Sequence, residues 1–182
     1  MITAPPPEQT SRAISTEEVA HLTSRRGQPS ETLANVVRLV KERFETDVCS
    51  VYLLEPDRAT LVLAATVGLK PESVGRIRMG LNEGLAGLVA EELRPIMVED
   101  ATRHPRFKYF REAGEDAYRS FLGVPLLDQG MIQGVLVVQT ANPRTHPPEA
   151  INLLAATAAQ LGTVVGEARV LEKFVAPTYE RI

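Results

Sequence analysis

Apolar residues first recur with a helical period between residues 30 and 44. Five of them fall on one face of the helix that this spacing predicts: Leu33, Val36, Val37, Val40 and Phe44. Ser30 is expected to cap this helix, and charged residues occupy its other side. A shorter helix is predicted upstream, where Ser15 and Glu18 have the spacing of a capping box. Two helices are therefore expected before the first strand.

After residue 47 the pattern changes to short apolar runs bounded by turn residues, which is typical of strands. Six runs fit this description: residues 48–54, 61–66, 74–79, 96–99, 122–127 and 131–140. Further helices are predicted from about Gly84 and from Pro147 to about Lys173. Short turns between consecutive strands favour a largely antiparallel sheet. The expected fold is therefore α+β, with the terminal helices on one face of the sheet.

The long C-terminal helix carries apolar residues on two sides. One stripe includes Leu154, Leu161 and Val165, and the opposite side carries Leu153, Thr157 and Val164. The sheet needs only one stripe, so the other predicts pairing with a second copy of the chain in a homodimer. The N-terminal helix covering this stripe within the monomer is the alternative. A dimerisation scaffold that binds no ligand is kept as a second functional hypothesis.

A long connection without a convincing apolar period runs from Asp100 to Arg119. Together with Phe121 just after it, this connection contains five of the nine aromatic residues of the chain, and its own four are Phe107, Tyr109, Phe110 and Tyr118. It also carries positive charge: Arg103, His104, Arg106, Lys108, Arg111 and Arg119. Long loops inside compact domains often form binding lids, and aromatic residues supply apolar surface. This pattern predicts a lid over a pocket for a small polar or anionic ligand, or alternatively an anchored surface loop.

Three glycines, Gly80, Gly84 and Gly87, mark the turn before the predicted central helix. Glycine permits a sharp strand-to-helix turn and a close approach of the backbone. A helix that begins near Gly84 would direct free N–H groups at whatever lies above the sheet, which makes an anion site. A tight turn packed under the helix explains the same glycines equally well.

The charge and composition of the chain mainly exclude classes of function. Lys and Arg number 20 against 23 Asp and Glu, a formal net charge of −3, which disfavours binding to nucleic acid. No apolar run approaches the roughly 20 residues that span a bilayer, so no membrane partner is expected. A signal peptide is not recognisable at the start of the chain, and Cys49 is its only cysteine, so a cytoplasmic location is predicted.

Few residues have the spacing that catalysis or metal binding requires. Cys49 lies among apolar residues of a predicted strand and is expected to be buried and inert. His21, His104 and His146 are far apart in the sequence, which predicts no metal site. No Ser–His–Asp spacing and no phosphate-binding loop of the Walker type occurs. The chain is therefore expected to be neither an enzyme nor a cofactor protein.

Several segments in order resemble a known family: residues 47–53, 64–69, 82–89, 104–109, 121–126 and 134–139. Through them the stretch from Glu31 to Arg169 resembles a GAF domain, a module that senses small molecules. It is most similar to the N-terminal GAF domain of the nitrogen-related phosphoenolpyruvate–protein phosphotransferases. The resemblance implies a six-stranded antiparallel sheet, helices on one face, and a ligand pocket on the other face under the loop after Asp100.

The resemblance also implies a regulatory role in a signalling or phosphotransferase-system protein. Glutamine is the leading expected ligand, with 2-oxoglutarate beside it, and the terminal helices would pass the signal to a following effector domain. Family members that reduce methionine sulfoxide use several cysteines, whereas Cys49 has no resolving partner here. The late Asn-Lys-Phe-Asp-Glu signature of cyclic-nucleotide sensors is absent. A cyclic-nucleotide sensor and a haem sensor using His104 remain as further alternatives.

The expected organisation is a tail over residues 1–12, an N-terminal helix and linker over 13–29, the GAF domain over 30–170, and a helix end and tail over 171–182. Nothing after Arg169 resembles the catalytic region that carries the phosphorylated histidine of that family. The residues expected to bind the ligand are Gly84, Leu85, Asp100, Tyr109, Tyr118, Arg119 and Ser120. A small molecule, a second copy of the chain and an effector domain are the expected partners.

Overall fold

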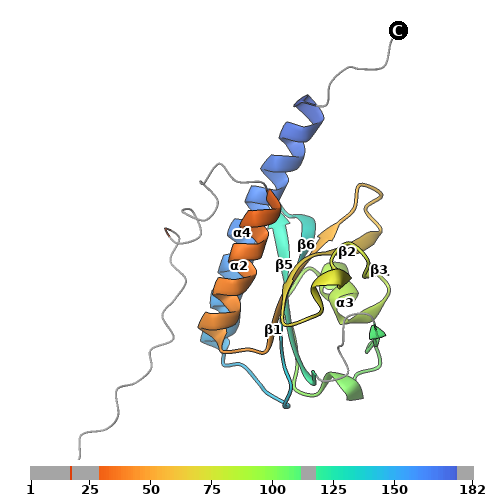
Figure 1. Cartoon of the computed structure of the whole chain (residues 1–182), viewed down its shortest axis with the longest axis vertical. Coiled ribbons are helices and arrows are strands. Elements are labelled where there is room, and N and C mark those ends of the chain that lie inside the picture. The colour runs from red at the N-terminus through yellow and green to blue at the C-terminus, as the bar shows by residue number, and fades with distance from the viewer. Residues whose placement is uncertain (1–16, 18–28, 112–117, 176–182) are drawn as a thin grey trace, which may run out of the picture.

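The computed structural model describes residues 29–111 and 118–175, together with Glu17 (Figure 1). Its centre is one six-stranded sheet in the order β3-β2-β1-β6-β5-β4, and every neighbouring pair is antiparallel. Helices α2 (Pro29–Phe44) and α4 (Pro148–Val175) lie on one side of the sheet, and α3 (Gly84–Glu92) lies on the other. The predicted α+β architecture is confirmed.

The strands are β1 (Val48–Leu54), β2 (Thr60–Val67), β3 (Arg78–Gly80), β4 (Ile96–Val98), β5 (Ser120–Asp128) and β6 (Met131–Thr140). Two 3₁₀ turns, Pro71–Ser73 and Ala101–Arg103, lie in the connections. The central strands β1 and β6 are buried along almost their whole length. Because helices cover both faces of the sheet, most residues of these strands are apolar, and they do not alternate regularly with polar residues.

The third strand is shorter than the sequence predicts. Residues 74–79 were expected to form it, but β3 covers only Arg78–Gly80. The chain before it follows the 3₁₀ turn, and Gly75 has a φ of 80°, a left-handed conformation that interrupts an extended strand. Val74 is correspondingly exposed, whereas Ile77 is buried. The apolar residues before β3 therefore belong to a turn in which Ile77 is buried, and not to an extended strand.

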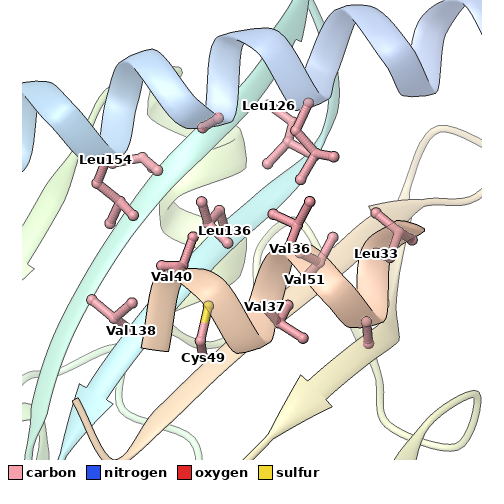
Figure 2. Close-up of a cluster of buried hydrophobic side chains, with 14 of the residues drawn as sticks. Leu33, Val36, Val37, Val40, Cys49, Val51, Leu126, Leu136, Val138 and Leu154 are labelled. Carbon is pink, nitrogen blue, oxygen red and sulfur yellow. The ribbon is translucent and has the colours of Figure 1, made fainter. Parts of the chain in front are cut away.

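The first core lies between the sheet and the helices α2 and α4 (Figure 2). The five predicted apolar residues of α2 are all buried in it, so this face of the helix is confirmed. The helix begins at Pro29, one residue before the expected cap at Ser30, which suits proline in a first helical turn. At the other end, the Arg144 guanidinium donates to the carbonyl oxygens of Phe44 and Glu45 at 3.2 and 2.9 Å. These bonds satisfy acceptors that the helix leaves free.

Helix α4 approaches the end of β5 unusually closely. A Cβ on Gly162 would lie 2.5 Å from the carbonyl oxygen of Leu127, and one on Gly166 would collide with the carboxylate of Asp128. Arg169 then donates to Gln133 Oε1 at 3.0 Å and to the carbonyl oxygen of Leu54. Beyond this region the helix extends past the sheet (Figure 1).

The predicted second stripe of α4 is partly used within the monomer. Thr157 is buried and its hydroxyl donates to the carbonyl oxygen of Leu153 at 3.0 Å. Leu153 and Val164 are half-buried. In the described parts of α2 and α4, no large hydrophobic side chain is exposed. The predicted upstream helix, including Ser15 and Glu18, lies outside the described residues, and dimerisation stays a prediction.

Candidate functional site

A small cavity lies on the side of the sheet that faces α3. Its volume is about 30 Å³, which has room for about two water molecules. Its floor consists of side chains from four strands: Tyr52 of β1, Met79 of β3, Phe121 of β5, and Val137 and Gln139 of β6. The cavity therefore lies over the middle of the sheet, on the face opposite α2 and α4.

Gln139 is the polar side chain of this floor that sequence reasoning missed. It pairs in register with Val48 on one side and with Phe121 on the other. The residue is only 9% exposed, and the described part of the chain gives its side-chain amide no hydrogen-bond partner. An amide that faces a cavity can donate to or accept from a polar ligand or an ordered water there. The only sequence signal was its two-residue spacing from Val137.

The first turn of α3 forms one wall of the cavity through Gly84, Leu85 and Ala86. Gly84 has a φ of 66°, so the turn into the helix requires glycine. Glu83, at the N-cap, makes no side-chain hydrogen bond to the helix. The first N–H groups of a helix have no intrahelical acceptor, so this end is suited to an anion. The structure thus brings two expected ligand-binding residues, Gly84 and Leu85, to the cavity.

Gly87 has a different role from Gly84. A Cβ at Gly87 would lie 2.8 Å from the carbonyl oxygen of Gly80 and 2.9 Å from that of Leu81. This glycine lets the helix pack directly on the preceding turn. Close packing under the helix therefore explains Gly87, whereas an anion site at Gly84, which lines the cavity, stays a prediction.

The loop covers the cavity with Phe107, Lys108 and Phe110. The Lys108 ammonium is 3.0 Å from Glu83 Oε2 and 5.2 Å from the centre of the Phe110 ring. That ammonium, followed by the Gly80 N–H group, holds the pKa of Glu83 below its usual value. Residues 112–117 of the expected lid lie outside the described residues.

Ion pairs fasten the loop to its surroundings. Arg106 donates to Glu91 Oε2 at 2.9 Å and to the carbonyl oxygen of Leu81 at 3.2 Å. Its neighbour Lys108 is paired with Glu83, as described above. Two of the basic residues that the sequence places in this loop are therefore paired with acidic residues on and before α3. The loop is anchored and borders the cavity, and its role as a lid over a ligand stays a prediction.

Tyr118 closes another side of the cavity. Its hydroxyl donates to the carbonyl oxygen of Gly68 at 3.1 Å. Tyr118 lies just before β5 and Gly68 just after β2, so the side chain reaches across the ends of β6 and β1. Partial burial, and the negative charge of Asp47, raise the pKa of the phenol above its usual value.

Four other expected binding residues do not line the cavity. Arg119 Nη2 is 2.5 Å from Asp100 Oδ2, so this pair ties the two ends of the loop together. The Arg119 guanidinium, followed by Thr102, lowers the pKa of Asp100 to about 2. Ser120 is buried, with its hydroxyl 2.5 Å from that of Thr140, and Tyr109 is 44% exposed. Their predicted contacts with a ligand have no counterpart in the cavity lining.

Cys49 lies on the wrong side of the sheet to take part in the cavity. It is fully buried in the core under α2, and burial raises the pKa of its thiol far above the usual value. Among residues 29–111 and 118–175, no group of three His, Cys, Asp or Glu side chains could hold a metal ion. Within those same ranges no helix combines the length and apolar character that crossing a membrane requires.

Comparison with known proteins identifies similar chains. Residues 28–165 match the family described as the GAF domain. The phosphoenolpyruvate-dependent phosphotransferase system protein of Salmonella typhimurium is 33% identical over 145 residues, which are 80% of this chain and 19% of that protein. The nitrogen fixation protein VnfA of Azotobacter vinelandii is 27% identical over 153 residues, 79% of this chain and 29% of that protein. The chain spans less than a third of the length of either relative.

Solved structures have the same architecture. The GAF domain from an Acinetobacter phosphoenolpyruvate-protein phosphotransferase superposes with a TM-score of 0.77 at 33% identity, covering 86% of this chain and 94% of that one. The free methionine-R-sulfoxide reductase of Neisseria meningitidis, solved with its substrate, superposes with a TM-score of 0.75 at 21% identity, covering 94% and 97%. At that identity the second similarity concerns the fold alone.

Proposed function

Because the chain belongs to the GAF domain family, whose relatives here include regulators of nitrogen fixation, we propose that this regulatory sensory domain binds a small polar metabolite with a carboxylate group. Glutamine and 2-oxoglutarate are the ligands proposed first. The ligand occupies the cavity between α3 and the sheet, and its occupancy is passed on through the terminal helices. A cytoplasmic location and a following effector domain are part of this proposal.

One juxtaposition carries the proposal: the uncapped first turn of α3 and the unpartnered amide of Gln139 line the same cavity. The helix end attracts an anion, and the amide can donate to or accept from a second polar group. An α-amino or α-keto acid carries both kinds of group on a short chain. This complementarity supports a metabolite of the glutamine class.

The proposed ligand needs more space than the cavity in the structure provides. The cavity of about 30 Å³ is far below the ~300 Å³ at which ligand pockets generally begin. Phe107 and Phe110 form its roof, so binding is expected to displace this part of the loop outward. Ligand would then shift the population toward an open arrangement of the loop.

The proposal includes no catalysis by this chain. One protein with this fold is a free methionine-R-sulfoxide reductase. Here the single cysteine faces the helices α2 and α4, and its raised pKa disfavours the thiolate. Phosphotransferase activity belongs to the full-length relatives, of which this chain matches about a fifth.

Thermal unfolding of the purified chain tests the proposal against glutamine, 2-oxoglutarate, other amino acids, nitrate and cyclic nucleotides. A ligand at 100 times its dissociation constant adds about 2.7 kcal/mol to the free energy of unfolding. That increase corresponds to a rise in Tm of several degrees. Gln139→Leu should lose the shift, whereas the distant, exposed Asn152→Ala should keep it. An unchanged Tm across the panel contradicts the proposal.

A dimerisation scaffold is the second candidate function. The small cavity and its aromatic lining, from Phe107, Phe110 and Phe121, favour it, because they close this sheet face without a ligand. Light scattering of the whole chain over a range of concentrations measures its mass. A stable dimer that responds to no ligand of the panel would favour the scaffold over the sensor.

A further inference from the structure

Lys108, which belongs to the loop over the cavity, lies beside the first turn of α3. Its Cβ is 3.7 Å from the position that a Cβ on Gly84 would occupy. Lys108, Gly84 and Gln139 all line the cavity. A cation, a helix N-terminus and a nine-tenths buried amide without a partner in the described residues thus meet in one small space. Together these three groups offer a ligand more polar contacts than a helix N-terminus alone.

The Lys108 ammonium has an acidic partner within the chain. The Lys108 ammonium is 3.0 Å from Glu83 Oε2, and the two side chains are 39% and 44% exposed. Exposed ion pairs contribute little to stability, so exchange of the partner costs little. Glu83 also keeps a second donor, the N–H group of Gly80 at 3.1 Å. The carboxylate of Glu83 therefore remains hydrogen-bonded when Lys108 leaves it.

Lysine suits such an exchange because its ammonium is a single charge on a flexible stem. A carboxylate bound at the first turn of α3 would lie beside the start of this side chain. Lys108 also interacts with the ring of Phe110, which roofs the cavity. Movement of the ammonium toward the cavity would therefore change the contacts of the roof as well.

From these observations we infer that Glu83 is an internal competitor of the ligand for Lys108. The Glu83 carboxylate holds the ammonium in the structure, and a carboxylate ligand at the first turn of α3 takes it over. This inference rests on the proposed function, and it adds regulation of affinity by a residue outside the cavity lining. The ligand class it requires is a small carboxylate, because an uncharged group would not compete for the cation.

Calorimetric titration of the whole chain with L-glutamine, 2-oxoglutarate and L-glutaminamide, which lacks the free carboxylate, tests the inference. Glu83→Gln retains an acceptor for Gly80 and should bind the carboxylate ligand about two- to fivefold more tightly. Lys108→Met should bind it at least about tenfold more weakly. In the double variant the gain from Glu83→Gln should vanish, because Glu83 acts through Lys108.

Glu91→Gln is the matched control. It removes the other ion pair between the loop and α3, at 2.9 Å from Arg106, and neither residue lines the cavity. Its affinity should equal that of the wild type. Binding by the wild type with no gain in Glu83→Gln overturns the inference and leaves the proposed function standing. Binding of glutaminamide as tight as glutamine also overturns it. If neither the wild type nor Glu83→Gln binds either carboxylate, both the inference and the proposed function fail.

Discussion

The two faces of the sheet differ in how completely they are packed. On the face of α2 and α4, residues such as Val37, Leu136 and Leu154 are entirely buried and form a continuous apolar core. On the face of α3, the packing leaves a cavity that contains an unpartnered amide, Gln139, under a loop held by surface ion pairs. One face is thus continuously packed, whereas the other contains a cavity.

The largest expected effect comes from breaking the packed face. Leu154→Ala should lower the free energy of unfolding by about 2–5 kcal/mol, because it removes a fully buried side chain and leaves a hole. Chemical denaturation measures the change. Exposed Asn152→Ala, on the same helix, is the control and should have little effect. A similarly small loss for Leu154→Ala would show that this face is not a rigid core.

A smaller loss is expected where α4 meets the sheet. Gly162→Ala should lower the free energy of unfolding by about 1–3 kcal/mol, because the new Cβ would lie 2.5 Å from the Leu127 carbonyl oxygen. In an exposed helix the same substitution usually stabilises by about 1 kcal/mol. Urea denaturation measures the sign of the change in the free energy of unfolding. A stabilised variant would contradict the close contact.

On the cavity face, loss of a single hydrogen bond should be milder. Tyr118→Phe removes the donor to the Gly68 carbonyl and should lower the free energy of unfolding by about 0.5–1.5 kcal/mol. Amide hydrogen exchange should increase locally around the end of β2. Tyr109→Phe, at an exposed tyrosine of the same loop, provides the comparison and should change neither measurement.

The smallest effect concerns pH. The pKa of Asp100 is lowered to about 2 by Arg119 and then Thr102, so its ionised form is stabilised in the folded state. This contribution is complete above the ordinary aspartate pKa of about 4 and is lost as the pH falls toward 2. Asp100→Asn should therefore reduce the dependence of Tm on pH between 5 and 2. Identical profiles for both proteins would show that the pair adds no stability.

Sequence patterns predicted the packed face better than the cavity face. The period of residues such as Val36 and Val40 identifies the buried side of α2, because a helix that covers a sheet needs one apolar stripe. The apolar residues around Gly75 predict a strand there, but Val74 is exposed and only Ile77 is buried, so the segment forms a turn. The local sequence pattern therefore predicts an element well where only one of its faces is buried.

The cavity was harder to predict, because it is formed by residues that are distant in the sequence. Phe107, Phe110 and Tyr118 could be expected near a ligand, but Gln139 is one polar residue in an apolar strand and gave almost no signal. The pairing of Lys108 with Glu83 spans 25 residues, so the sequence showed the positive charge without its neutralisation. Such partners become visible only when the loop and helix are placed together.

The close contact at Gly162 and Gly166 holds α4 against the end of β5, so a tilt of the helix would pivot about this contact. From Gly166 to the end of the helix at Val175, the arm is about 14 Å long at 1.5 Å per residue. A tilt of about 10° at the pivot moves the tip by about 2 Å. The end of β5, which carries Leu127 and Asp128, is therefore the part of the sheet about which such a tilt would turn.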